Sequence, residues 1–143
     1  MHYKASTNRV LTTVAAAILF AISANIFADN GQNKAGQLPI PSDVALASWS
    51  DNGHGGRYLL QFARGRTLAK GEQAIGIVAS DTNCKPDALG LSHCNNIIRL
   101  ANGGRITVID THKMSANPCL RPGEGITLTG MGGPWIMGIL PRG

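Results

Sequence analysis

The chain is poor in charge, in aromatic side chains and in helical patterning. Charged residues occupy 15% of its 143 positions and aromatic residues 5%. No stretch after Ala28 keeps a helical period of apolar residues over three turns, which argues against a helical fold. The basic residues are spread out and no aromatic residues alternate with them, so nucleic acid is not an expected partner. At this length the chain has room for one domain.

Cysteine is also scarce, with only Cys84, Cys94 and Cys119 present. Three cysteines permit one disulfide within the chain and leave one thiol over. In an oxidising compartment a leftover thiol is buried, paired with another chain, or functional. The odd count therefore makes the cysteines the first place to look for chemistry.

The N-terminal 28 residues have the features of a secretory signal. Lys4 and Arg9 precede an uncharged, mostly apolar run over residues 10–27, and Ala28 offers a cleavage position. Because the run is close to the length that spans a bilayer, an uncleaved anchor is the alternative. We therefore predict an extracytoplasmic protein, periplasmic or secreted. Loss of Lys4 and Arg9 would lower the net charge from +5 to +3, which leaves a weak attraction to anionic surfaces.

The remainder of the chain is predicted to be β-rich. Glycine and proline make residues 29–43 a flexible linker, and residues 44–143 are predicted to form a single domain. Short apolar segments separated by glycine-rich turns are typical of strands, and they occur at residues 44–50, 57–63, 74–79, 97–101, 105–110, 126–129 and 135–140. Residues 80–93 are predicted to be an irregular loop. The pattern indicates a mainly β fold, either a small sandwich or a barrel-like domain built on hairpins.

The clearest hairpin joins residues 97–101 to residues 105–110 through the turn Asn102-Gly103-Gly104. A three-residue loop with glycine at positive φ gives one apolar and one more polar face, whereas a two-residue loop mixes charge and core on both faces. We therefore expect the apolar face to carry the pairs Leu100–Ile106, Ile98–Val108, Asn96–Asp110 and Cys94–His112.

The first hypothesis for this region is a disulfide between Cys94 and Cys119. Export makes disulfides available. Such a bond would close a loop of about 25 residues and contribute ~3 kcal/mol in the chain-entropy model. His112 would then be an ordinary strand residue and Met114 would fill the core.

The second hypothesis is a soft-metal site formed by Cys94, His112, Met114 and Cys119. Sulfur ligands together with imidazole suit copper(I), and zinc where thiolates dominate. The step His112-Lys113-Met114 resembles one used by periplasmic copper chaperones. That resemblance implies copper as the cofactor.

The third hypothesis is thiol catalysis, with Cys94 as nucleophile, His112 as base, and Asp110 or Asn96 orienting the imidazole. Ser92-His93-Cys94 followed by Arg99 resembles the Ser-His-Gly-Cys…Arg signature of L,D-transpeptidases, which cross-link peptidoglycan. This chain lacks the glycine and separates Cys94 from Arg99 by four residues rather than one. The resemblance implies a cysteine-dependent envelope enzyme acting on peptidoglycan or peptides.

Small size and the expected loss of Cys94 to a disulfide favour a binding or structural role over catalysis. The sequence therefore predicts an exported cell-envelope module, more a binder than an enzyme. It would bind copper or zinc near residues 94–119, and its partner would be an envelope protein or ligand that the sequence does not identify.

Overall fold

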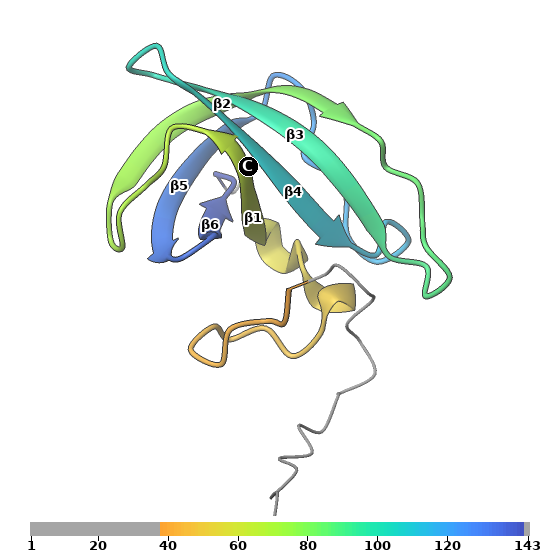
Figure 1. Ribbon diagram of the computed structural model, residues 1–143. Coiled ribbons are helices and arrows are strands. Elements are labelled where there is room, and N and C mark those ends of the chain that lie inside the picture. The colour runs from red at the N-terminus through yellow and green to blue at the C-terminus, as the bar shows by residue number, and fades with distance from the viewer. Residues whose placement is uncertain (1–37, 142–143) are drawn as a thin grey trace, which may run out of the picture.

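The computed structural model describes residues 38–141, which form a closed barrel of six antiparallel strands (Figure 1). Around the barrel the strands follow the order β1-β4-β3-β2-β5-β6. The mainly β prediction is confirmed, and the architecture is the barrel. The predicted signal 1–28 and the linker up to residue 37 lie outside the described residues. The elements are η1 (Trp49–Asp51), η2 (His54–Gly56), β1 (Arg57–Gly65), β2 (Gln73–Thr82), β3 (Ser92–Leu100), β4 (Arg105–His112), β5 (Gly125–Gly132) and β6 (Trp135–Ile139).

The barrel interior is apolar at one end and polar at the other. Alternate residues of β3 and β4 are buried, because successive side chains of a strand point to opposite faces. Near the β3–β4 turn these inward residues are Ile98, Leu100, Ile106 and Val108, and they belong to the main apolar core. Toward the other end the inward residues become polar or sulfur-bearing. They are Ser92, Cys94, Asn96, Asp110 and His112.

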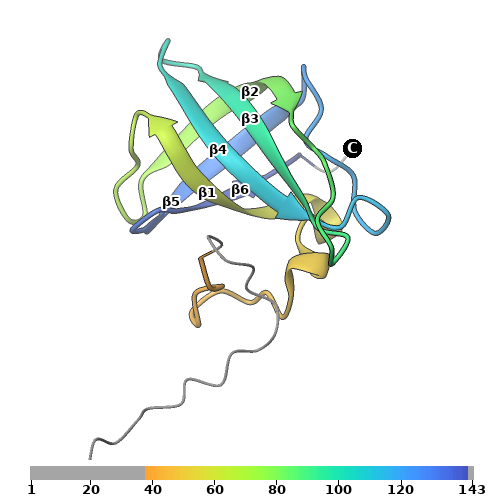
Figure 2. The same cartoon turned by 45° about the vertical axis from the view of Figure 1, so that its right-hand side comes forward.

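The polar end is also where the longer connections gather (Figure 2). The β2–β3 loop over residues 83–91, the β4–β5 loop over residues 113–124 and the two 3-10 turns all lie at this end. The predicted irregular loop 80–93 is therefore shorter than expected, because β2 continues to Thr82 and β3 begins at Ser92. Loops from three parts of the chain thus meet beside a buried polar layer.

The predicted register of the β3–β4 hairpin was wrong by two residues, although its faces were right. Ile98 lies opposite Ile106, and Cys94 lies opposite Asp110 rather than His112. The cause is the position of the loop: Leu100 N donates to Gly104 O, which leaves residues 101–103 as the three-residue loop. Gly103 takes a φ of +89° there, a conformation that glycine adopts without steric cost. A shift of two residues returns each side chain to the same face.

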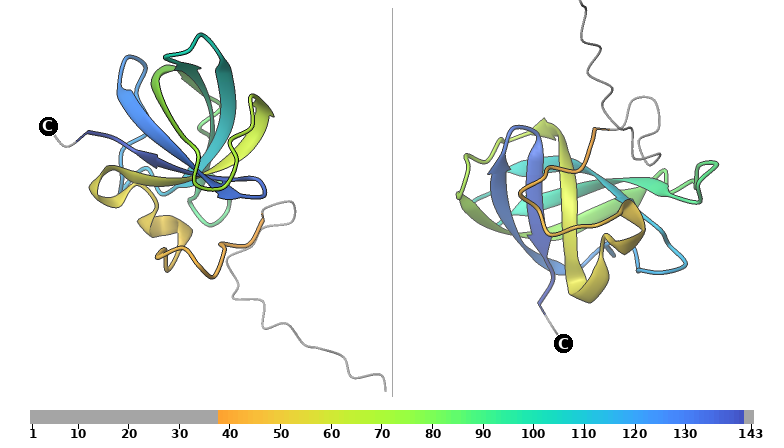
Figure 3. Two further views of the ribbon diagram at one scale, coloured as in Figure 1. Left: turned by 90° about the vertical axis from the view of Figure 1, so that its left-hand side faces the viewer. Right: turned by 90° about the horizontal axis from the view of Figure 1, so that it is seen from below.

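Residues 44–50 do not form the predicted strand. They run outside the barrel as irregular chain that ends in η1, across the outer faces of β1 and β6 (Figure 3). Trp49 packs there with Leu59 in a second apolar cluster, which Val44 and Leu46 partly cover. Each of the six strands already has two partners, so this segment packs on the barrel through side chains and only Trp49 is buried. Among residues 38–141, no helix has the length and apolar character needed to cross a bilayer.

Gly76 allows close packing in the apolar half of the barrel. It is buried in β2, opposite Leu100 of β3. A Cβ at this position would lie 2.6 Å from Cγ2 of Ile98 and 2.8 Å from the backbone oxygen of Arg99. Since backbone cannot move aside cheaply in a packed barrel, any side chain here overpacks the core.

We predict that Gly76→Ala lowers the free energy of unfolding by about 1–3 kcal/mol, the usual cost of overpacking. Gly125→Ala is the matched control, because a Cβ at Gly125 in β5 would meet nothing within 4 Å. It should change stability by less than about 0.5 kcal/mol. Urea denaturation of the three proteins measures this, and equal losses in both variants would show that Gly76 is not sterically required.

Candidate functional site

The three cysteines converge with one carboxylate at the polar end of the barrel. Asp81 lies near the end of β2, Cys84 in the β2–β3 loop, Cys94 in β3 and Cys119 in the β4–β5 loop. Their sulfur atoms and a carboxylate oxygen of Asp81 all lie within 4.8 Å of one another. Cys94 is buried and the other three are half-buried. Four potential ligand atoms from four segments therefore form one compact cluster, here named the Cys3Asp cluster.

The predicted Cys94–Cys119 disulfide is not the pairing in the structure. Cys94 is bonded to Cys84, with their Cα atoms 4.3 Å apart, and Cys119 is a free thiol. The chain leaves β2 through Asn83, whose φ of +61° is left-handed, a region that asparagine tolerates better than most residues. This turn sets Cys84 beside the early part of β3. The short β2–β3 connection therefore supplies the partner of Cys94.

Asp81 links the disulfide to the free thiol. Its Oδ1 lies 3.0 Å from Sγ of Cys84, and its carboxylate forms a hydrogen bond with the Cys119 thiol. Burial raises the pKa of Cys119, and the negative charges of Asp81 and Asp110 raise it further. Burial, followed by the charge of Asp110, also raises the pKa of Asp81. Cys119 is therefore held in its protonated form at neutral pH.

A buried Asp–His pair lies on the adjoining strand. Oδ2 of Asp110 is 3.1 Å from Nδ1 of His112, and both side chains are fully buried. Asn52 fastens this pair to the 3-10 segment, because its amide donates to Asp110 Oδ1 at 3.4 Å and to Thr111 O at 2.8 Å. Burial raises the pKa of Asp110, and the contact with His112 partly offsets this shift. Asp110 and His112 are thus held in place by β4 and by the chain that precedes β1.

Several polar atoms in this layer have no hydrogen-bond partner among residues 38–141. They are Ser92 Oγ, Asn96 Oδ1, Asp110 Oδ2 and both ring nitrogens of His112. Asp110 Oδ2 and His112 Nδ1 approach each other as an ion pair and not as an aligned hydrogen bond. Tyr58 closes the layer, with its ring packed edge-on against His112 at a centroid distance of 6.4 Å. Its hydroxyl donates to Pro118 O at 2.7 Å, which ties β1 to the loop that carries Cys119. Unpartnered buried polar groups cost stability, so this layer is a departure from an optimally stable core.

The structure brings together part of each predicted site. For the metal hypothesis, Cys94 and Cys119 lie in the Cys3Asp cluster, whereas His112 is outside it and Met114 is 48% exposed in the turn after β4. For the catalytic hypothesis, Asp110 and His112 are in contact, but Cys94 is buried in a disulfide. A disulfide sulfur is not a thiolate nucleophile, so the resemblance to L,D-transpeptidases has no free cysteine to act through in this state.

Sequence reasoning missed Asp81 and Cys84. Their separation by two residues was a usable signal, because it places a carboxylate and a sulfur next to each other at the end of an apolar segment. The odd cysteine count was the other signal, since it already marked Cys84 as a residue in need of a role. Neither signal identifies which residues of the other strands lie nearby.

We predict that Asp110→Asn makes the unfolding free energy less dependent on pH. The pKa of Asp110 is raised in the folded state, so protonated Asp110 favours folding. This contribution to stability is fully present below the unfolded-state pKa of about 4. It is lost as the pH rises through the folded-state pKa. Wild-type stability should therefore fall with rising pH relative to the variant. Urea denaturation from pH 4 to 8 measures this, with Asp43→Asn at an exposed position as control. Parallel curves for wild type and Asp110→Asn would contradict the assignment.

No protein-family model, curated protein or solved structure matches this chain. The functional argument consequently rests on the geometry of the Cys3Asp cluster and of the layer beside it.

Proposed function

We propose that this chain is an extracytoplasmic module that binds one soft metal ion, zinc or copper(I), at Asp81, Cys84, Cys94 and Cys119. The observation that carries the proposal is the mutual distance of at most 4.8 Å between the four ligand atoms. In a tetrahedral zinc site with Zn–S bonds of about 2.3 Å, neighbouring sulfurs lie about 3.8 Å apart. The Cys84 and Cys94 sulfurs are bonded to each other and must move apart to reach this spacing once the bond is reduced. The ligand atoms of Asp81 and Cys119 already lie within 4.8 Å of both sulfurs.

Metal binding requires the reduced form of the cluster. A dithiol reductant donates two electrons to the Cys84–Cys94 bond and becomes a disulfide itself, which leaves three cysteine thiols beside Asp81. Thiolates are the ligands, so each thiol that binds the ion releases its proton. A bound cation reverses the effect of the negative charges around Cys119, because it favours the thiolate over the thiol. Affinity should consequently rise with pH.

The ligand set narrows the choice of metal. Soft thiolates suit both copper(I) and zinc, whereas a hard carboxylate oxygen suits zinc better than copper(I). Three sulfurs alone provide a trigonal site for copper(I), and Asp81 completes a tetrahedral site for zinc. Loss of the Asp81 carboxylate should therefore weaken zinc binding more than copper(I) binding.

The disulfide supports an extracytoplasmic location. Disulfides form and persist in oxidising compartments and are rare in the cytosol, and the chain joins Cys84 to Cys94. In such a compartment the oxidised form does not bind metal through these two sulfurs. The reduced, metal-bound form would be made by an envelope partner that supplies electrons.

Thiol–disulfide exchange is a second candidate function, favoured by the free Cys119 beside the Cys84–Cys94 bond. Cys119 would pass its proton to Asp81 and attack Sγ of Cys94. A Cys94–Cys119 bond forms, the Cys84–Cys94 bond breaks, and the Cys84 thiolate takes the proton back. No net oxidation occurs. The product is the pairing that the sequence predicted, and it places a free thiol in the β2–β3 loop.

We predict that the reduced protein retains one equivalent of zinc or copper(I) in native mass spectrometry under anaerobic conditions. Cys119→Ser should weaken binding by about 100-fold or more, because loss of a direct ligand exceeds the 10–100-fold cost of losing an outer-shell partner. Met114→Leu is the control and should bind as the wild type does. Asp81→Asn should lower the affinity for zinc more than the affinity for copper(I). A reduced protein that retains no metal, or equal affinity in Cys119→Ser and wild type, would contradict the proposal.

We also predict that alkylation of Cys119 in the oxidised protein is slow at neutral pH and accelerates only above the ordinary thiol pKa of about 8.5. Asp81→Asn removes a negative charge and a hydrogen bond that both raise the Cys119 pKa, so its rate profile should move to lower pH. Asp43→Asn should leave the profile unchanged. Mass spectrometry of the Cys119 peptide measures the rate.

The same samples report the disulfide pairing. If exchange occurs, the Cys94–Cys119 bond should accumulate together with alkylated Cys84 as the pH rises. A sample that contains only the Cys84–Cys94 bond at every pH would exclude the exchange function and leave the metal proposal standing.

A further inference from the structure

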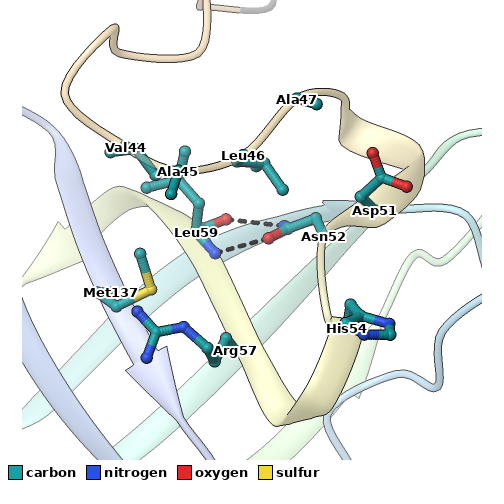
Figure 4. Close-up of a pocket in the computed structure, with 10 residues that line it drawn as sticks. All are labelled: Val44, Ala45, Leu46, Ala47, Asp51, Asn52, His54, Arg57, Leu59 and Met137. Atoms are coloured by element: carbon teal, nitrogen blue, oxygen red, sulfur yellow. Dashed lines mark hydrogen bonds between the residues drawn. The ribbon is translucent and has the colours of Figure 1, made fainter.

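A hollow remains where residues 44–52 cross the outside of the barrel. It has a volume of about 460 Å³, within the usual range for small-molecule sites. Figure 4 shows its walls: Val44, Ala45 and Leu46 on one side, Leu59 and Met137 on the other. This part of the lining is entirely apolar. The remaining lining residues are Ala47, Asp51, Asn52, His54 and Arg57.

Arg57 is the charged group at the apolar part of this hollow. It begins β1, is exposed, and lies beside Met137 in Figure 4. No carboxylate among residues 38–141 forms an ion pair with it. Asp51 also lines the hollow, but it accepts a hydrogen bond from Ser48 Oγ and lies on the 3-10 turn, away from Arg57 (Figure 4). The hollow therefore combines an apolar wall with one unpaired cation.

The side-chain amide of Asn52, which lines the hollow, is already engaged. The side-chain amide of Asn52 donates to Leu59 O at 3.0 Å and its Oδ1 accepts from Leu59 N at 2.7 Å. Figure 4 shows both bonds as dashed lines. These bonds hold the 3-10 segment against β1, so the hollow is bounded by fixed backbone. A ligand would find Arg57, and not Asn52, available for its polar group.

We propose that this hollow binds a small amphipathic anion, an apolar chain that ends in a carboxylate. The chain lies against Val44, Leu46, Leu59 and Met137, and the carboxylate accepts hydrogen bonds from the Arg57 guanidinium. Arginine presents paired donors that match a carboxylate. Burial of the ligand chain against the apolar wall supplies the non-directional part of the affinity. This site does not involve the Cys3Asp cluster and does not depend on the metal proposal.

The chain contains its own reporter for this site. Trp49 and Trp135 are its only tryptophans, and their ring centroids lie 5.8 Å apart in the same apolar cluster as Leu59, Val44 and Met137. A ligand that fills the hollow changes the environment of this cluster. Intrinsic fluorescence therefore reports binding without a label.

The test is a fluorescence titration of the oxidised, metal-free protein with decanoate below its micelle concentration. We expect a saturable change with decanoate and weaker binding of 1-decanol, which has the same chain length and no charge. Arg57→Gln should lower the affinity for decanoate by about tenfold or more, which is the scale of one charge-assisted hydrogen bond. Arg57→Lys should recover part of the loss. Arg64→Gln, at an exposed arginine of the same strand, should bind as wild type does.

A filling variant tests the location. Ala45→Leu adds bulk to the apolar wall and should abolish the decanoate signal while thermal unfolding stays cooperative. An absent or non-saturable decanoate response in the folded wild type would overturn the proposal. Equal affinity for decanoate and 1-decanol, with no effect of Arg57→Gln, would contradict the proposed contact between the ligand carboxylate and Arg57. Because metal is absent from these samples, failure here is separate from failure of the metal site.

Discussion

The pairing of β3 with β4 is the interaction on which the arrangement of the site depends. This pairing decides which side chains of both strands enter the barrel, and the same alternation that sends Ile98 and Ile106 inward also sends Cys94 and Asp110 inward. A slip of one residue would carry all of these side chains to the outer surface. The apolar half of the hairpin thus fixes the position of the polar half, because the core residues cannot leave the interior without a large loss of buried area.

The buried polar groups at one end of the barrel lower the stability of the fold, and burial of the apolar side chains at the other end offsets this loss. Asp110 and His112 are fully buried in contact with each other, and isolated buried charges are expensive unless they are paired. Next to them, Cys119 and Asp81 hold each other in protonation states that disfavour a free thiolate. Perturbed groups of this kind gather at functional sites more often than elsewhere. The cluster therefore brings three sulfurs and a carboxylate together in a partly buried place, where metal binding or disulfide exchange first has to overcome the raised pKa of Cys119.

The sequence predicted the hairpin faces correctly because two residues of register error leave the alternation of side chains unchanged. It could not predict the cysteine pairing, since the partner of Cys94 depends on a left-handed Asn83 and on the path of an irregular loop. Residues 44–50 were predicted as a strand because they are apolar, and composition alone does not say whether an apolar segment pairs its backbone or only packs its side chains. The prediction of Met114 as a metal ligand requires the strand to continue beyond His112, so that His112 and Met114 share one face. The strand ends there, so the alternation that would have turned Met114 inward no longer applies.

Closure of the barrel also limits how another protein can recognise this domain. β1 joins β6 as well as β4, so each of the six strands has a neighbour on both sides. An incoming peptide strand therefore finds no free edge to extend, and recognition by strand addition is closed to it. A partner must instead contact side chains. The loops at the polar end present such side chains, and their sequence can change without disrupting the pairing of the strands. Recognition of this domain consequently depends on side chains of its loops and of the outer faces of its strands, because the strand backbones are already paired with one another.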